Sequence, residues 1–340
     1  MKNIKFTFGL LAIVTLCLSQ SCTDVETANP EKSRAMPVVF VPISPYEFVF
    51  ERIAGDLVDV RVIVGPGEDP HSYLPTPKQV VEISEANLLC AGELGFEGNF
   101  FIKEGDGTNG PKHVNLLKNL DLLEGHCDHP SHLTEHSEDG HGHSEHHEHE
   151  HKEDGHGHDK KGEDEHDDHH GHHDHEDLND PHVWLSPSAL KVQADYIATE
   201  LKTLLPEDKS AEIDENVAAF KAELTGLHEE LSETLRPHKG RKFYVYHGAF
   251  AYFAKDFGLE QIAVEDGNKS PTPSHVATMV KQAKADGVKL VFIQPQFNQA
   301  GAKALAEAID GRVVTLDPLE KDIFTNLRRI AKAVTGEEGN

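Results

Sequence analysis

The chain has 340 residues and a formal net charge of −27, with 59 acidic and 32 basic residues. This length is enough for two domains of ordinary size, and the lack of a clustered basic segment in the sequence argues against nucleic acid as a partner. A strongly anionic protein suits a cationic ligand better than an anionic one.

The N-terminal segment has the pattern of an export signal. Two lysines precede an apolar stretch from Phe6 to Leu18, which is shorter than the roughly 20 residues that a membrane-spanning helix needs. Ser19-Gln-Ser-Cys22 follows, and a small residue directly before a cysteine is typical of the cleavage site of bacterial lipoproteins. We therefore predict a signal peptide over residues 1–22, lipidation of Cys22 after cleavage, and a polar tether over residues 23–36. The mature protein is expected in the cell envelope, either periplasmic or anchored to a membrane by its lipid.

After the tether, short apolar runs alternate with amphipathic segments, which is the pattern of an α/β fold with parallel strands. The strands expected here are Val38–Val41, Val58–Val64 and Asn87–Ala91, and the helices are Phe48–Ala54 and Lys78–Ala86. Together with a helix over Ser188–Leu205, these elements predict an N-terminal α/β lobe over residues 37–206.

Residues 126–177 form a tract that interrupts this lobe and holds 18 of the 25 histidines, 18 carboxylates and three lysines. With so few apolar residues, it cannot offset the entropy lost on ordering, and we predict a disordered loop. Neutral imidazole is a common ligand of Zn²⁺, and carboxylates add oxygen ligands. The tract is therefore expected to bind several metal ions weakly, with a solvated acidic linker as the alternative.

Two cysteines of the mature chain have no assigned role. Cys90 lies in a predicted strand, and Cys127 lies at the start of the tract. An oxidising compartment permits a disulfide between them. The alternative is a buried Cys90 that acts as a small apolar side chain and a free thiol at Cys127, and both interpretations stay open.

One apolar stripe defines the longest predicted helix, over residues 207–237. The stripe recurs at intervals of three and four residues, at Ile213, Val217, Phe220, Leu224, Leu227, Leu231 and Leu235. Strand and helix patterns then alternate again at Lys242–Tyr246, Ala249–Phe257, Ile262–Val264, Val276–Ala285, Leu290–Ile293, Ala300–Ile309 and Val313–Leu316. We therefore predict a second α/β lobe with a parallel sheet over residues 238–335, joined to the first lobe by one long rigid helix.

Three histidines outside the tract, His71, His182 and His247, stand at strand ends or in loops rich in Pro and Gly. Asp317 follows the last predicted strand. Because parallel sheets place ligand-binding groups at the carboxyl ends of their strands, and because three imidazoles with one carboxylate suit tetrahedral Zn²⁺, we predict a zinc site formed by these four residues. The other histidines outside the tract are expected on solvated helix faces or loops: His113, His228, His238 and His275.

Four motifs carry a resemblance to a known family: Asp69-Pro-His-Ser-Tyr-Leu-Pro-Thr-Pro77, Asp180-Pro-His-Val-Trp-Leu-Ser-Pro187, His247-Gly-Ala-Phe-Ala-Tyr-Phe-Ala-Lys-Asp-Phe-Gly-Leu259 and Leu316-Asp-Pro-Leu319. Over roughly residues 37–335 the chain resembles the solute-binding proteins of metal-specific ABC importers (cluster A-I), and most closely the receptors of high-affinity zinc uptake systems. The resemblance implies two α/β lobes with the metal between them, the ligands His71, His182, His247 and Asp317, and a permease and an ATPase as partners.

Two features of this resemblance separate zinc from manganese. Manganese-binding relatives carry a carboxylate where this chain has His247, and the acidic histidine tract is typical of zinc members. The chain departs from the family pattern at Gln294-Pro-Gln-Phe297, where Glu-Pro-Gln-Phe is usual, and at Gly248-Ala-Phe250, where Asp-Ala-Phe is usual. Neither departure removes a proposed ligand.

The function expected from the sequence is that of a monomeric extracytoplasmic receptor that captures Zn²⁺ and delivers it to an ABC importer. An enzyme is not expected, because a zinc hydrolase needs an open metal position and a general base, and the sequence predicts no HExxH-type helix. The alternatives are a stand-alone periplasmic zinc buffer or chaperone, and a manganese- or iron-specific receptor of the same family.

Overall fold

The computed structural model describes residues 36–99, 110–125, 179–265 and 271–336. The predicted signal peptide with Cys22, the tether up to residue 35 and the histidine-rich tract lie outside these residues. The chain divides into two units, Met1–Ala35 and Met36–Asn340, and the described residues belong to the second. Among the helices of the described part, none has both the length and the apolar character that crossing a membrane requires.

The first four strands form a parallel sheet in the order β2-β1-β3-β4. They are β1 (Val38–Val41), β2 (Asp59–Val62), β3 (Leu88–Ala91) and β4 (Lys112–Asn115). The central strands β1 and β3 are almost entirely buried, as their apolar runs predict. The edge strand β4 has no such run, since Val114 is its one buried residue, and the sequence pattern therefore does not predict it.

Three helices pack with this sheet: α1 (Ser44–Ala54), α2 (Pro77–Ser84) and α3 (Pro187–Leu204). α1 begins at Ser44 rather than at the predicted Phe48, because a proline in its first turn favours helix initiation there. Thr76 and Ser186 cap α2 and α3 through their side-chain oxygens, and each directly precedes a proline at the first helical position. These caps fix where the loops before the two helices end.

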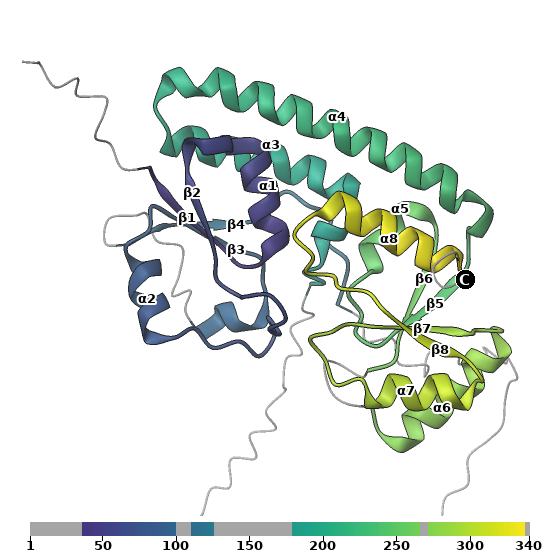
Figure 1. Ribbon diagram of the computed structural model, residues 1–340. Helices are drawn as coiled ribbons and strands as arrows, with labels where there is room; N and C mark the ends of the chain where they lie inside the picture. Colours follow the sequence, from purple (N-terminus) through teal and green to yellow (C-terminus); the bar gives the residue numbers. More distant parts are fainter. Residues whose placement is uncertain (1–35, 100–109, 126–178, 266–270, 337–340) are drawn as a thin grey trace, which may run out of the picture. The chain divides into compact units, whose positions relative to one another are not determined.

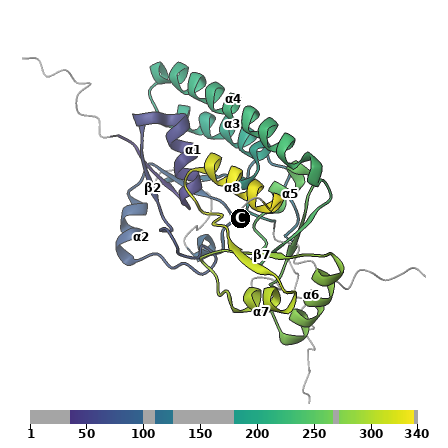
Figure 2. The same cartoon turned by 45° about the vertical axis from the view of Figure 1, so that its right-hand side comes forward.

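The last four strands repeat the first sheet in the order β6-β5-β7-β8. They are β5 (Lys242–Val245), β6 (Glu260–Ala263), β7 (Leu290–Ile293) and β8 (Arg312–Thr315). The helices of this lobe are α5 (Ala251–Phe257), α6 (Pro273–Ala285), α7 (Ala300–Ala308) and α8 (Ile323–Thr335). In both views α6 and α7 lie on the side of the sheet away from α8 (Figures 1 and 2). α8 is a further element that was not assigned from the sequence.

The longest helix, α4 (Ser210–Leu235, 26 residues), runs along both lobes (Figure 1). Short 3₁₀ turns at Glu207–Lys209 and Arg236–His238 flank it. All seven residues of the predicted apolar stripe are buried, and the helix contacts α1, α3 and α8. The prediction of two α/β lobes with parallel sheets joined by one long helix is confirmed.

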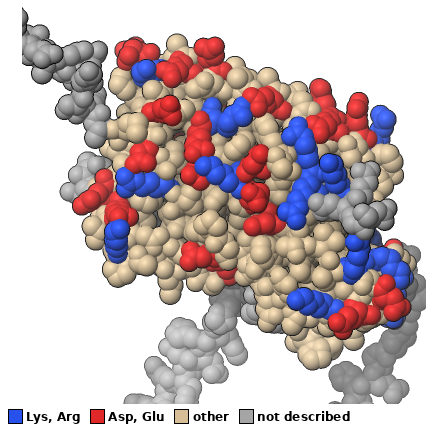
Figure 3. Space-filling view, viewed as in Figure 1, with Lys and Arg blue, Asp and Glu red and all other residues tan. Residues whose placement is uncertain are grey.

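One cluster of buried side chains continues from the first lobe through α4 into the second. Phe324 of α8 stacks on Phe220 of α4, with ring centroids 5.9 Å apart, and meets Phe48 of α1 edge-on at 5.5 Å. On the surface above these helices, basic and acidic side chains are interspersed (Figure 3). Lys321 forms ion pairs with Glu47 and Glu51 of α1. A shared core of this kind favours a stiff connection between the lobes.

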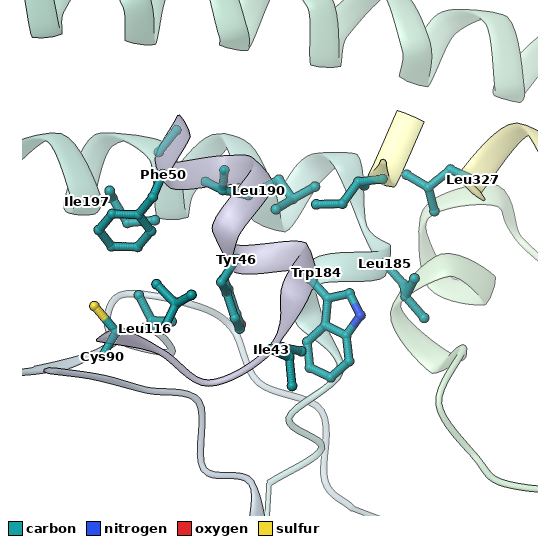
Figure 4. Packing of buried hydrophobic residues seen from close by; sticks show 14 of the residues in the cluster. Ile43, Tyr46, Phe50, Cys90, Leu116, Trp184, Leu185, Leu190, Ile197 and Leu327 are labelled. Atoms are coloured by element: carbon teal, nitrogen blue, oxygen red, sulfur yellow. The ribbon is translucent and has the colours of Figure 1, made fainter. Parts of the chain in front are cut away.

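Cys90 is a free thiol that is fully buried in β3. Figure 4 shows it beside the core of the first lobe, where Tyr46, Leu116 and Ile197 also lie. Burial raises the pKa of the Cys90 thiol well above its ordinary value. Of the two interpretations left open by the sequence, Cys90 fits that of a buried apolar side chain, while Cys127 lies outside the described residues.

The described residues that flank the histidine-rich tract are bonded to each other. Glu124 and Asn179 form an antiparallel bridge, and the backbone N–H of Asp180 donates to the carbonyl of Leu123 at 2.8 Å. The hydroxyl of Tyr252 in α5 accepts from the N–H of Leu123 at 2.8 Å and donates to the carbonyl of Asp180 at 2.9 Å. The described residues before and after the tract are therefore held together at one closed base.

Candidate metal centre

His71, His182 and His247 converge on one point. Nε2 of His247 lies 3.2 Å from Nε2 of His71 and 3.1 Å from Nε2 of His182, and a ligand atom from each of the three lies within 4.8 Å of the others. Zinc–nitrogen bonds of about 2.0–2.1 Å in a regular tetrahedron separate neighbouring nitrogens by about 3.3–3.4 Å. The spacing of the rings therefore fits a single tetrahedral ion.

Each histidine comes from a different part of the fold. His71 lies in the loop between β2 and α2, His182 directly precedes the 3₁₀ turn Val183–Leu185, and His247 follows the central strand β5. The N-terminal lobe thus contributes His71 and His182, and the C-terminal lobe contributes His247. As predicted, the parallel arrangement brings together residues that are 65 to 176 positions apart in the sequence.

Two buried carboxylates bind the outer nitrogens of two of these rings. The Nδ1–H of His182 donates to Oδ1 of Asp180 at 2.7 Å, and the Nδ1–H of His247 donates to Oε1 of Glu265. Both carboxylates are 7 % exposed. A proton held on Nδ1 leaves the lone pair of Nε2 for a metal, so these carboxylates select the ligand tautomer and orient the rings.

Burial favours the neutral form, which a metal requires, for two of the rings, His71 and His182. Burial, reinforced by the neighbouring rings of His182 and His247, lowers the pKa of His71 to about 3. Burial also lowers the pKa of His182, although Asp180 opposes this shift. When Nδ1 carries the proton, the Nε2 lone pairs of His182 and His247 face each other at 3.1 Å, and a cation between them removes their repulsion.

The two Asp-Pro-His motifs hold their histidines in related ways. Oδ1 of Asp69 accepts from the backbone N–H of His71, and Oδ1 of Asp180 accepts from the backbone N–H of His182, both at 2.9 Å. The His71 loop also passes close to Gly95, where a Cβ atom would lie 2.9 Å from the carbonyl oxygen of His71. A side chain at position 95 would therefore displace the backbone that carries this ligand.

Asp317 lies after β8, as predicted, but it is not part of the close histidine group among the described residues. Its Oδ1 accepts from Nε2 of Gln296 at 2.7 Å and from the backbone N–H of Leu319 at 2.9 Å. Its carbonyl accepts from Nδ2 of Asn326 at 2.8 Å. The structure thus assembles three of the four predicted ligands, with the carboxylate of Asp317 bound to protein groups.

The other histidines that the structure describes do not join a group of potential ligands. His113 lies in β4 rather than on a helix face or in a loop. His228 of α4 packs against Phe257, with ring centroids 5.3 Å apart. All four weaker candidates are half-buried instead of fully solvated: His113, His228, His238 and His275.

A cavity with carboxylates in its lining opens at the histidine group, and aromatic rings also pack against this group. The cavity, of about 660 Å³, is lined by the three histidines and by carboxylates that include Glu93, Glu124 and Glu260. The ring of Phe297 stacks on His247 at 4.4 Å, and the indole N–H of Trp184 donates to the carbonyl of Pro318 at 2.8 Å. A cation can thus approach past carboxylates, while packed rings restrict approach where they cover the histidines.

Comparisons with known proteins agree with this geometry. The zinc-binding lipoprotein AdcA of Streptococcus pneumoniae serotype 4 is 27% identical to the chain over 326 residues, which cover 94% of this chain and 56% of AdcA. The chain thus spans little more than half the length of that relative. These relatives are named for binding metal and not for catalysis, which agrees with the expectation that the chain is not an enzyme.

Two solved structures extend the comparison. A crystal structure of ZnuA is 30% identical, with a TM-score of 0.70, and covers 89% of this chain and 99% of ZnuA. A zinc-bound ZnuA lacking residues 138–173 of its own numbering is 30% identical, with a TM-score of 0.69, and covers 90% of this chain and 99% of that one. The sequence profile of "Zinc-uptake complex component A periplasmic" matches residues 39–334. The resemblance predicted from the motifs is therefore confirmed, and the chain belongs to the family of periplasmic A components of zinc-uptake complexes.

Proposed function

We propose that the protein is an extracytoplasmic receptor that captures Zn²⁺ and delivers it to an ABC importer composed of a permease and an ATPase. The observation that carries this proposal is the convergence of three histidine rings, with Nε2 of His247 at 3.2 Å and 3.1 Å from those of His71 and His182, close to the spacing in a tetrahedral zinc site. Family membership, the zinc-binding relative AdcA and the zinc-bound ZnuA structure support zinc as the ligand.

The proposed ligands are His71, His182, His247 and Asp317. Both side-chain hydrogen bonds of Asp317 involve Oδ1, and we propose that Oδ2 supplies the fourth ligand when the ion is bound. A set of three nitrogens and one oxygen favours Zn²⁺ over Mn²⁺, which prefers oxygen ligands. Because water can replace a single oxygen ligand, Asp317 is expected to contribute less to affinity than any of the histidines.

The carboxylates of Asp180 and Glu265 offset the positive charge of a bound zinc ion. Three neutral imidazoles carry no charge, so the carboxylate of Asp317 offsets only one of the two positive charges of the ion. Asp180 and Glu265 are bonded to the ring N–H groups of two ligands and supply two negative charges inside the buried site. Zinc can therefore be bound in a buried position without a large uncompensated charge, while the histidines remain the direct ligands.

The proposed location and partners follow from the same assignment. We propose a monomeric receptor in the cell envelope, periplasmic or anchored to a membrane, where a permease can receive its zinc; the predicted signal peptide and the predicted lipidation of Cys22 support this location. A stand-alone zinc buffer or chaperone is the alternative function, and a manganese- or iron-specific receptor is the alternative within the family.

Metal analysis and competition titration test the ligand and its site. The wild-type protein is expected to bind Zn²⁺ much more tightly than Mn²⁺. Asp317→Ala is expected to weaken zinc binding by less than tenfold, because water can take the place of one oxygen. A loss for Asp317→Ala larger than that for His71→Ala would contradict this ranking of the ligands.

Growth under zinc chelation tests delivery. A strain that lacks this gene should grow poorly with a zinc chelator, and wild-type protein should restore growth. The double variant His71→Ala, His182→Ala should not restore growth. Restoration by the wild-type protein in a strain that also lacks the permease would favour the buffer over the importer receptor.

A further inference from the structure

Gln294 is a fully buried polar residue whose side-chain amide bonds to one proposed zinc ligand, His247. It directly follows β7, and its side chain is 0 % exposed. Its Nε2 donates to the carbonyl of His247, and its Oε1 accepts from the backbone N–H of His247, both at 3.0 Å. The amide of Gln294 thus binds both backbone groups of a proposed zinc ligand.

This reciprocal pair continues the sheet beyond the last strand residues. The N–H of Tyr246 donates to the carbonyl of Phe292 at 2.8 Å, which extends the pairing of β5 with β7. At the next position the amide of Gln294 takes the place of a peptide group and pairs with His247. Buried backbone groups need partners, and here a side chain provides both of them for one residue.

We propose that Gln294 is a positioning residue for zinc binding, which fixes the backbone of His247 so that its Nε2 points at the other two rings. The inference rests on the proposed function. Glu265 fixes the rotation of the His247 ring through Nδ1, and Phe297 packs on its face. Gln294 supplies the remaining restraint, because ring orientation is useful only when the backbone that carries the ring is held in place.

The pair requires a side chain that both donates and accepts a hydrogen bond. An apolar side chain of the same length leaves the N–H and the carbonyl of His247 without these buried partners. A carboxyl group, as in the Glu-Pro-Gln-Phe pattern of related receptors, offers a donor and an acceptor only when it is protonated. An amide offers both at every pH.

Gln294→Met tests the proposal, with Gln193→Met as the matched control. Gln193 is also 0 % exposed, and its Nε2 donates to the carbonyl of Leu116 at 2.8 Å and to the hydroxyl of Tyr46 at 3.2 Å. Both substitutions remove a buried amide and keep an apolar side chain of similar length. Only the first removes contacts to a zinc ligand.

We expect Gln294→Met to weaken zinc binding by about 10- to 100-fold, as for other residues that orient metal ligands. With Co²⁺ as the probe, the visible absorption spectrum of the bound ion should differ between Gln294→Met and wild type, because this spectrum reports the geometry of the ligands. Gln193→Met should lower the thermal stability yet keep the zinc affinity within about threefold of wild type and leave the Co²⁺ spectrum unchanged.

The outcomes separate this inference from the proposed function. Wild-type zinc affinity and an unchanged Co²⁺ spectrum in Gln294→Met would overturn the role of Gln294, as would equal losses of affinity in both variants. Failure of the wild-type protein to bind zinc tightly would overturn the proposed function instead. If Gln294→Met does not fold, Gln294→Asn serves by the same criteria, since its shorter amide reaches at most one of the two backbone groups.

Discussion

The two lobes have the same sheet but present their zinc ligands differently. Both sheets are parallel, with the orders β2-β1-β3-β4 and β6-β5-β7-β8. His247 follows the central strand β5 almost directly, whereas His71 lies farther from the edge strand β2, in a loop with Pro and Gly. The contacts at His247 hold its ring and its backbone, while those at His71 hold its backbone.

This difference shows that a shared topology does not determine how firmly a ligand is held. How firmly a ligand is held depends on its distance from the strand and on the hydrogen-bond partner of its ring. In the C-terminal lobe, the ring and the backbone of His247 are both held by hydrogen bonds. In the N-terminal lobe, His71 lies on a loop that is supported by Asp69 and by the close approach of Gly95. We expect the ion to order the His71 loop more than the surroundings of His247.

The largest effect should come from removing direct ligands. His71→Ala, His182→Ala and His247→Ala should each weaken zinc binding at least about tenfold, because each removes a nitrogen ligand. His182→Ala and His247→Ala should have greater effects than His71→Ala, since each also leaves a buried carboxylate, Asp180 or Glu265, without its ring partner. Competition titration measures the affinities, and unchanged affinity in the double variant His71→Ala, His182→Ala would show that the site is elsewhere.

Removing an outer carboxylate should have the next largest effect. Glu265→Gln and Asp180→Asn should weaken zinc binding by about 10- to 100-fold, because they withdraw the negative charge that fixes the ring tautomers. Glu260→Gln is the matched control, since Glu260 lines the same cavity and pairs with Lys242 at 3.8 Å. Equal losses in the control and in Glu265→Gln would indicate a general effect of charge in the cavity.

The metal-free protein should lose stability in acid partly through His71. Its pKa is about 3 in the folded protein, against roughly 6.5 in an unfolded chain. The unfolded state therefore takes up the proton first, so the contribution to stability is complete above about pH 6.5 and declines as the pH falls toward 3. The decline is at most about 1.4 kcal/mol per pH unit for this histidine.

Urea unfolding of the metal-free protein at several pH values measures this decline. The variant His71→Gln lacks the titrating ring, so its stability should fall less steeply between pH 6.5 and pH 4 than that of the wild type. His182 also has a lowered pKa from burial and should add to the slope that remains. Identical slopes in wild type and variant would mean that His71 is not buried in the metal-free protein in solution.

The smallest effect on the tight site should follow removal of the histidine-rich tract. Joining Gly125 to Asn179 through a short Gly-Ser linker keeps the base closed by the Glu124–Asn179 bridge and by Tyr252. Calorimetry should show the strong zinc-binding event within about threefold of its wild-type affinity, with the weak events lost because the many histidines of the tract are gone. Loss of the strong event would show that the tract supplies a ligand to the tight site.

The elements that the sequence predicts best are those whose burial is continuous. β1 and β5 have apolar runs, and every residue of the α4 stripe is buried. β4 carries a single buried residue and leaves no comparable pattern. α8 was not assigned from the sequence, although Ile323, Leu327, Ile330 and Val334 recur at helical spacing and are buried.

Only part of the site could be predicted from the sequence, because only some of its residues stand in a recognisable local pattern. The three histidines stand in strand-end and Asp-Pro-His contexts that can be recognised locally, and Asp180 could have been found from the same motif. Glu265 follows β6 and reaches His247 only because β6 pairs with β5, so no local sequence signal identifies it. Gln294 depends in the same way on the pairing of β5 with β7.

The closed base at Tyr252 has a consequence for how the protein can evolve and be engineered. Leu123 and Asp180 bond to each other and to the Tyr252 hydroxyl, so the segment that carries His182 is supported by contacts that do not involve the residues between them. The intervening sequence can therefore lengthen, shorten or change composition under selection that does not act on the zinc ligands. For the same reason this position is suited to the insertion of a fluorescent reporter domain, which would convert the receptor into a sensor without rebuilding its metal site.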